Sequence, residues 1–310
     1  MPIVLSSVPV VRVLNGDCRE VLKTLPDGSV NCCVTSPPYF GLRDYGHPGQ
    51  IGLEPTPEAY VAQMVAVFRE VRRVLRDDGT LWLNLGDSYA NPGHYKGNPG
   101  SGLNSHAQAE KENGHKHEKS WPGAKNKDLI GIPWRVAFAL QADGWYLRQD
   151  IIWHKPNPMP ESVTDRCTKA HEYIFLLSKS ERYWFDSEAM KEPAVYAGSG
   201  RESKKRGEFN DKGQSVGREP FRAITETRNR RSVWTVATKP YKGAHFATFP
   251  STLIEPCILA GCPKGGVVLD PFGGSGTTGE VAKKHGRAAI LVELNPAYLH
   301  LIHDRTNKES

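Results

Sequence analysis

The sequence predicts an α/β fold in which helices alternate with the strands of a mostly parallel sheet. Apolar runs of strand length alternate with longer stretches of helical periodicity along most of the chain. Two of the apolar runs lead directly into unusual turns, at residues 35–39 and 270–279. The length of 310 residues suits one large domain, or one domain that carries an insertion.

The elements of the first half follow from local patterns. Strands are expected at three apolar runs, residues 10–14, 30–35 and 80–85. A short helix is expected at 18–25, before the turn signal Pro26-Asp27-Gly28. A longer helix is predicted at 57–75, where apolar residues recur at helical spacing: Tyr60, Met64, Val67, Phe68, Val71 and Leu75. Asp77-Asp78-Gly79 should end it.

The second half contains a long polar stretch followed by further strands and helices. Glycine, asparagine, histidine and lysine dominate from about 91 to 127, which predicts a mobile loop with solvated histidines. Beyond it, helices are expected at 133–141, 251–261, 276–285 and 296–304. Strands are expected at 145–153, 172–177, 266–270 and 288–293.

Composition limits the cellular setting and the partners. No apolar run approaches the ~20 residues that span a bilayer, and Met1 to Val13 lacks the basic start of a signal peptide. The six cysteines include no C-x-x-C pair, which favours reduced, buried thiols over a zinc site. We therefore expect a cytoplasmic protein without a metal. The net charge of +6 permits an anionic partner.

The turn Thr35-Ser36-Pro37-Pro38-Tyr39 follows the apolar run from Val30 to Val34. Its two prolines fix φ and lack N–H donors, so neither can extend a strand ladder. The result is a stiff turn that presents a hydroxyl, outward carbonyls and an aromatic ring. Such a set can hold a flat polar ring by its edge and its face. The competing interpretation is a proline-rich loop with a packed tyrosine.

A glycine-rich turn, Asp270 to Gly279, joins a predicted strand to a predicted helix. Glycines let a ligand approach the backbone, and the helix start offers N–H groups and a positive dipole end. Glu293 closes the next strand, 14 residues after Gly279, where its carboxylate can accept both ribose hydroxyls. Gly274-x-Gly276-x-x-Gly279 also matches the dinucleotide fingerprint, so a NAD-dependent oxidoreductase is a competing hypothesis.

Residues 190–243 are strongly basic, with 13 Lys/Arg against 6 Asp/Glu, a local net charge of +7. Aromatic residues are interleaved with these charges: Tyr196, Phe209, Phe221, Trp234 and Tyr241. This mixture suits a segment that follows nucleic-acid phosphates and reaches base edges, with Arg228, Arg230 and Arg231 as candidates. A solvated insertion without a ligand is the simpler alternative.

Taken together, these motifs resemble those of the amino-group DNA methyltransferases. Thr35-Ser36-Pro37-Pro38-Tyr39 resembles their catalytic motif, and the glycine turn with Val292-Glu293-Leu294-Asn295-Pro296 resembles their S-adenosylmethionine site. The order, catalytic motif first, is similar to the permuted β class. The resemblance implies a Rossmann-like methyltransferase sheet, mostly parallel with an antiparallel strand, and helices on both faces. It divides the chain into a catalytic part at 1–189, a target-recognition insertion at 190–243 and a cofactor-binding part at 244–310.

The resemblance also implies roles for individual residues. The implied catalytic residues are those of the turn itself: Ser36, Pro37, Pro38 and Tyr39. The Ser36 hydroxyl and the Pro37 carbonyl are expected to face the amine, and the Tyr39 ring is expected to stack on the base. The residues implied to bind the cofactor are Asp17, Thr35, Phe249, Asp270, Pro271, Phe272, Gly274, Ser275, Gly276, Thr277, Thr278, Glu293 and Asn295. Trp153 and Lys155, in Trp153-x-Lys155-x-Asn157-x-x-Pro160, are expected beside the target-base pocket.

The implied reaction moves a methyl group from S-adenosylmethionine to the exocyclic amine of a base flipped out of duplex DNA. Serine before Pro-Pro-Tyr favours cytosine N4 in this family, and adenine N6 is the alternative. A cytosine-C5 mechanism would use a cysteine after proline, but Pro256-Cys257 falls inside a predicted helix, so we expect a packed thiol.

Three other activities also remain open: a non-catalytic DNA-binding module, an RNA methyltransferase and a protein-glutamine methyltransferase. The family is prokaryotic or phage-encoded, and the resemblance allows a separate cognate restriction endonuclease and a homodimer as partners.

Overall fold

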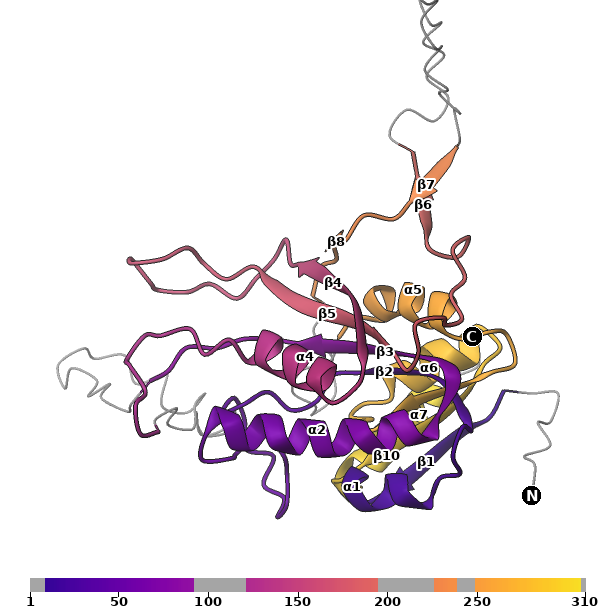
Figure 1. Ribbon diagram of the computed structural model, residues 1–310, viewed down its shortest axis with the longest axis horizontal. Helices are drawn as coiled ribbons and strands as arrows, with labels where there is room; N and C mark the ends of the chain where they lie inside the picture. Colours follow the sequence, from indigo (N-terminus) through magenta and orange to yellow (C-terminus); the bar gives the residue numbers. More distant parts are fainter. Residues whose placement is uncertain (1–8, 92–120, 195–225, 239–248, 308–310) are drawn as a thin grey trace, which may run out of the picture.

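The computed structural model describes residues 9–91, 121–194, 226–238 and 249–307 (Figure 1). Its main sheet has eight strands in the order β1-β10-β9-β2-β3-β5-β4-β8. They are β1 Val11–Asn15, β2 Val30–Thr35, β3 Leu75–Leu85, β4 Tyr146–His154, β5 His171–Ser178, β8 Val233–Thr235, β9 Val267–Asp270 and β10 Ala288–Glu293. Within this sheet β5 runs antiparallel to both of its neighbours, and the other pairings are parallel. The predicted mostly parallel sheet with an antiparallel strand is therefore confirmed.

Helices cover both faces of the sheet, as Figure 1 shows. One face carries α1 Cys18–Val21, the 3-10 turn η1 Leu22–Thr24, α2 Pro57–Val74 and α4 Ile132–Ala142. The other face carries α5 Ser251–Gly261, α6 Thr277–Lys284 and α7 Leu299–Thr306, with the 3-10 turn η2 Pro296–Tyr298 before α7. Successive strand side chains point to opposite faces, so Cys33 packs with the first group of helices and Cys32 with the second.

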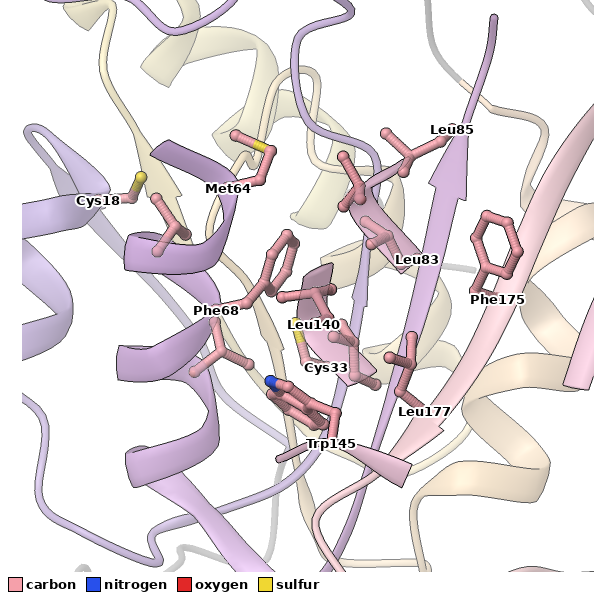
Figure 2. Close-up of a cluster of buried hydrophobic side chains, with 14 of the residues drawn as sticks. Cys18, Cys33, Met64, Phe68, Leu83, Leu85, Leu140, Trp145, Phe175 and Leu177 are labelled. Carbon is pink, nitrogen blue, oxygen red and sulfur yellow. The ribbon is translucent and has the colours of Figure 1, made fainter. Parts of the chain in front are cut away.

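The first core cluster lies between α2 and the sheet. Met64 and Phe68 of α2 are fully buried, and Figure 2 shows them among side chains such as Leu83 of β3 and Phe175 of β5. Helix α2 begins where the sequence signals it, because the Thr56 hydroxyl accepts a hydrogen bond from the Ala59 N–H at 3.2 Å and proline follows it. The apolar spacing predicted for this helix is confirmed.

Strand β3 differs from the sequence expectation. It begins at Leu75, directly after α2, and includes Asp77, Asp78 and Gly79, which we expected to form a turn. The register explains the difference, because Val30 of β2 pairs with Leu75 but Cys32 pairs with Thr80. The four residues between Leu75 and Thr80 therefore form a bulge, so the turn signal bends the strand without ending it.

Three short strands are not evident from the sequence. β6 Lys191–Pro193 and β7 Thr227–Asn229 form a separate two-stranded sheet. β8 adds to the edge of the main sheet beside β4, although it lies within the range 190–243. Residues 195–225 and 239–243 of that range, and 92–120 of the predicted mobile loop, lie outside the described residues. At the end of that loop, Trp121 packs edge-on against Phe40 at 6.1 Å between ring centroids.

The described residue ranges contain neither a membrane-spanning helix nor a metal-binding cluster. No helix in these ranges is long and apolar enough to cross a membrane. In the same ranges no group of three or more His, Cys, Asp or Glu side chains is arranged to hold a metal ion. All six cysteines are unpaired, and five of them are buried.

Candidate active site

The two turns singled out from the sequence lie side by side at the carboxyl edge of the sheet. β2 and β9 are parallel neighbours, with Cys32 opposite Val268, so their carboxyl ends meet. The Thr35 hydroxyl donates a hydrogen bond of 2.6 Å to Asp270 Oδ1, across 235 positions of sequence. The two turns are therefore close neighbours, and ligands of open α/β sheets bind at this edge.

Asp270 is the anchor that joins the turns. The residue is 2% exposed, and its carboxylate also accepts hydrogen bonds from the Thr278 hydroxyl at 2.7 Å and the Phe272 N–H at 3.0 Å. Burial raises the pKa of Asp270, and the hydrogen bonds from Thr35, Thr278 and Phe272 offset this only in part. Thr35, Asp270 and Thr278 therefore hold the glycine turn in place from beneath, as a support for any ligand above it.

The glycine turn needs glycine at two positions, 274 and 276. Gly274 has φ of +52° and Gly276 has φ of +83°, both in the left-handed region that other residues rarely adopt. A Cβ on Gly276 would also lie 3.0 Å from Cγ2 of Ile302, so α7 packs closely against the turn. Helix α6 then begins at Thr277 without a side-chain cap, which leaves its first N–H groups and its positive dipole end facing this edge.

Glu293 lies at the end of β10, next to the glycine turn. Its Oε2 accepts from the Gly274 N–H and its Oε1 from the Asn295 N–H, each at 2.8 Å. Burial raises the pKa of Glu293, and these two N–H groups oppose that shift. Each carboxylate oxygen keeps a further lone pair, so the group can still accept the two hydroxyls of a ribose. The donor set and the turn geometry fit a nucleoside cofactor.

Asp17 lies near Glu293 because the Gly16 N–H donates to the Glu293 carbonyl at 3.0 Å. Its side chain caps α1 and forms an ion pair with Arg19 at 2.5 Å. Burial raises the pKa of Asp17, but the hydrogen bonds from Arg19 outweigh it and the net shift is downward. Arg19 also donates to the Gly49 carbonyl at 2.8 Å, and nothing in the sequence distinguished this arginine.

Several residues predicted to bind the cofactor have side chains that contact other parts of the protein, so their role in cofactor binding stays a prediction. Ser275 is 1% exposed and its hydroxyl accepts from Arg305 at 2.9 Å. Thr277 is buried, and Asn295 caps η2 through a hydrogen bond from the Ala297 N–H at 2.9 Å. Pro271 is also buried, whereas Phe272 and Phe249 are half-buried beside the two core clusters.

The Ser-Pro-Pro-Tyr turn is held from below by α2. The Tyr60 hydroxyl donates to the Pro38 carbonyl at 2.8 Å, so that carbonyl already has a partner. Pro37 is buried and Ser36 is half-buried. The Ser36 hydroxyl donates a long hydrogen bond of 3.4 Å to the Tyr39 hydroxyl. These contacts fix the turn and leave Ser36 at the edge of the sheet.

The hydroxyl of Tyr39 points into a polar cluster beneath the turn. It lies 2.7 Å from Glu172 Oε2 and 3.2 Å from Asn84 Oδ1. Lys155 forms an ion pair with the other oxygen of Glu172. Burial, followed by the charge of Glu172, raises the pKa of Tyr39 well above its ordinary value. Sequence reasoning found Lys155 but missed Asn84 and Glu172, whose only signal is a polar side chain within or beside an apolar strand run.

Gly86 limits where the Tyr39 ring can lie. A Cβ on Gly86 would lie 2.5 Å from Cε2 of Tyr39, so the backbone of the chain just after β3 touches the ring. The ring is half-buried, and its stacking on a target base stays a prediction.

Trp153 is almost completely covered by its neighbours. The residue is 3% exposed, and its indole N–H donates to the Val236 carbonyl at 2.8 Å. The Lys155 ammonium lies 4.3 Å from the centroid of the ring. A ring covered to this extent has little surface left for direct contact with a base, and its place beside the target-base pocket stays a prediction.

The three candidate DNA-binding arginines lie at and after β7. Arg228 and Arg231 both pair with Glu192 of β6 at 2.9 Å. Arg230 lies over the ring of Trp234 at 4.5 Å. Arg231 has 69% of its side chain exposed, so of the three it offers the most accessible charge to a phosphate.

Cys257 is a packed thiol, as expected. It lies on α5 with no exposed surface, and burial raises its pKa well above that of a free thiol. A thiol in this state is not a nucleophile. The cysteine mechanism of cytosine-C5 transfer therefore has no support at Pro256-Cys257.

Comparisons with known proteins agree with this geometry. A family profile for DNA methylases matches residues 30–304. The type II methyltransferase M.Cfr9I of Citrobacter freundii is 48% identical over 301 residues, covering 96% of this chain and 88% of that protein. The type II methyltransferase M.SmaI of Serratia marcescens is 46% identical over 297 residues, covering 95% of this chain and 90% of that protein.

Two solved structures share the fold. The PvuII DNA methyltransferase, described as cytosine-N4-specific, matches with a TM-score of 0.64 and 19% identity, over 98% of this chain and 89% of that one. The Thermus thermophilus protein TTHA0409, a putative DNA modification methylase complexed with S-adenosyl-L-methionine, matches with a TM-score of 0.56 and 25% identity. That match covers 96% of this chain and 95% of the other.

Proposed function

Because the chain belongs to the DNA methylase family of N6 and N4 amino-methyltransferases, we propose that it methylates the N4 amine of cytosine in duplex DNA. The observation that carries this proposal is the hydrogen bond between Thr35 and Asp270, which brings the Ser36 turn beside the glycine turn. A methyl donor at one turn and an amine at the other would then share one edge of the sheet.

S-adenosylmethionine is the cofactor that fits this site, and it supplies a methyl group activated by a sulfonium. Glu293 would accept the ribose hydroxyls, beside Asp17 of the neighbouring strand end. The backbone of Gly274 and the start of α6 would lie against the methionine end, where N–H groups and the helix dipole favour a carboxylate. Phe272, which is half-buried, would contact the apolar faces of the cofactor.

The protein's part in the reaction is to align the amine and desolvate it. The lone pair of an exocyclic amine is delocalised into the ring, so the amine is a poor nucleophile. Acceptors at the Ser36 hydroxyl and the Pro37 carbonyl would each take one N–H and favour localising the pair on nitrogen. The amine would take the methyl group as the methyl–sulfur bond breaks with its electron pair returning to sulfur, and one N–H proton would then pass to solvent. Flipping the base out costs roughly a few kcal/mol.

Ser36 favours cytosine N4 over adenine N6, because members of this family that methylate adenine tend to carry Asp or Asn at this position. The test is nuclease digestion and mass spectrometry of duplex DNA treated with the protein and S-adenosylmethionine. We expect N4-methylcytosine, and its loss in Ser36→Ala. N6-methyladenine as the product would overturn the choice of base. A preference for RNA in a competition assay would overturn the choice of substrate.

Duplex DNA and a restriction-modification setting follow from the same proposal. The relatives named above are type II methyltransferases, so a cognate endonuclease acting separately is the expected companion. Residues around Arg228, Arg230 and Arg231 would contact phosphates. Binding to duplex DNA should then weaken steeply as salt rises, and a flat salt dependence would remove this role from the basic region.

A further inference from the structure

A chain of four polar side chains leads from the interior of the sheet to Ser36. Lys155, the residue after β4, pairs with one oxygen of Glu172 of β5. The other oxygen of Glu172 accepts from the Tyr39 hydroxyl at 2.7 Å. The Tyr39 hydroxyl in turn lies 3.4 Å from the Ser36 hydroxyl, which donates to it. Glu172 and Lys155 have only 14% and 18% of their side chains exposed.

The direction of every hydrogen bond in this chain is determined by its inner end. An ammonium can only donate, and an ionised carboxylate can only accept. The Asn84 amide NH₂ also donates to Glu172 Oε2 at 3.2 Å, and its orientation is fixed because it donates to the Tyr173 carbonyl at 3.0 Å as well. The other two neighbours of the Tyr39 hydroxyl, Glu172 Oε2 at 2.7 Å and Asn84 Oδ1 at 3.2 Å, are both acceptors. Tyr39 must therefore donate toward them, with the charged Glu172 as the shorter and stronger acceptor, and its oxygen is left to accept the proton of Ser36.

This direction matters because a serine hydroxyl, unlike a carboxylate, can either donate or accept. A Ser36 proton pointing at the target amine would bind the nitrogen lone pair that must attack the methyl group. A Ser36 proton pointing at Tyr39 leaves the serine oxygen lone pairs to accept an N–H of the amine. The two orientations therefore have opposite effects on nucleophilicity at the same distance.

We propose that Glu172 is a positioning residue for methyl transfer, acting through Tyr39 to hold the Ser36 hydroxyl as a hydrogen-bond acceptor for the target amine. The inference rests on the proposed function, since it assigns a task to Ser36 within it. The 3.4 Å distance between the Ser36 and Tyr39 hydroxyls suits an unliganded site, whose catalytic hydrogen bonds tighten when substrate binds. Gly86, packed against the Tyr39 ring, keeps the hydroxyl aimed at Glu172.

The decisive experiment measures the single-turnover rate of methyl transfer to duplex DNA. Glu172→Gln keeps the shape, but its amide can donate to Tyr39 and reverse the chain. We expect the rate to fall about tenfold or more, the size of one well-oriented hydrogen bond, while the dissociation constants for S-adenosylmethionine and DNA stay within about twofold. Glu70→Gln is the matched control, because Glu70 is a half-buried carboxylate paired with Arg73 at 2.9 Å on α2.

Non-additivity separates positioning from a merely structural role. Tyr39→Phe removes the hydroxyl in the middle of this series of hydrogen bonds and leaves the pair of Glu172 and Lys155 intact. It should lower the methyl-transfer rate to a similar extent. If Glu172 acts through Tyr39, Glu172→Gln in the Tyr39→Phe background should cost no further rate. An additive further loss, or a wild-type rate in either single variant, overturns the inference.

A second pair of variants serves if Glu172→Gln is unstable, and the wild-type activity separates failure of this inference from failure of the proposed function. If Glu172→Gln does not fold, the cycle of Tyr39→Phe with Ser36→Ala decides, because the double variant should be no slower than Ser36→Ala alone. A wild-type protein that methylates no amine in DNA defeats the proposed function itself. A wild-type protein that methylates DNA normally, with unaffected Glu172 and Tyr39 variants, defeats only the role of Glu172.

Discussion

Replacing Thr278 by valine removes a hydroxyl from a buried carboxylate with almost no change in shape. Thr278 donates to Asp270 Oδ2 at 2.7 Å, whereas Oδ1 has two donors, Thr35 at 2.6 Å and the Phe272 N–H at 3.0 Å. A hydrogen bond to a charged group contributes about 1.5–3 kcal/mol, and Asp270 has no access to bulk water that could replace it. We expect Thr278→Val to cost about 2 kcal/mol.

Thermal and urea unfolding measure this cost. For a chain of 310 residues, a loss of about 2 kcal/mol corresponds to a fall in Tm of roughly 3 °C. Thr35→Val should cost less, because Oδ1 keeps the Phe272 N–H. Thr24→Val is the control, since the Thr24 hydroxyl is exposed and bonds only to a carbonyl within its own turn, at 2.8 Å. A Thr278→Val protein as stable as the wild type would refute the assignment of Asp270 as the anchor.

The same variants should respond to pH in a defined direction. Burial raises the pKa of Asp270 above that of the unfolded chain, so the folded state holds the proton more tightly. The contribution of this carboxyl to the free energy of unfolding is therefore smallest at neutral pH. It increases as pH falls through the raised pKa, because the folded state binds the proton more tightly. Removing the Thr278 donor raises that pKa further. The destabilisation by Thr278→Val should be largest at pH 7 and shrink on acidification, and a loss that grows toward acid pH would contradict this sign.

Three further variants test separate parts of the site. Glu293→Gln can accept through only one side-chain oxygen, so one of the N–H groups of Gly274 and Asn295 loses its partner. Calorimetry should show S-adenosylmethionine binding weakened about tenfold. An unchanged dissociation constant would show that Glu293 does not contact the cofactor. Gly86→Ala should push the Tyr39 ring and lower the methyl-transfer rate by about tenfold or more with cofactor affinity intact; a normal rate would show that the ring position is unimportant. Cys257→Ser should fold and keep its activity, and a folded but inactive variant would revive the cysteine mechanism.

Local chemistry made much of the architecture readable from the sequence. Two prolines after an apolar run, and glycines between a run and a helix, fix backbone geometry within a few residues, so both turns and the strands before them could be placed. Helix α2 could be predicted from the helical spacing of its apolar residues. The alternation of Cys32 and Cys33 follows from the pleat of any strand.

The sequence could not show burial or the partners of polar side chains. Ser275 and Trp153 have the residue types expected of ligand contacts, yet both are covered by neighbours from other elements. Glu172 is 133 residues from Tyr39 in the chain and carries no motif of its own. Its position under the turn depends on β5 entering the sheet antiparallel to β3, which no local pattern specifies.

The sequence by itself determined which chemical groups this protein can use: a serine on a stiff turn, a flexible glycine turn and an acid at a strand end. Only the tertiary structure decided how they meet. It set β2 beside β9, so that Thr35 reaches Asp270, and it placed Glu172 beneath Tyr39. The physical reason is that backbone preferences act over a few neighbouring residues. Strand order and register are instead set by how the entire sheet buries its two apolar faces.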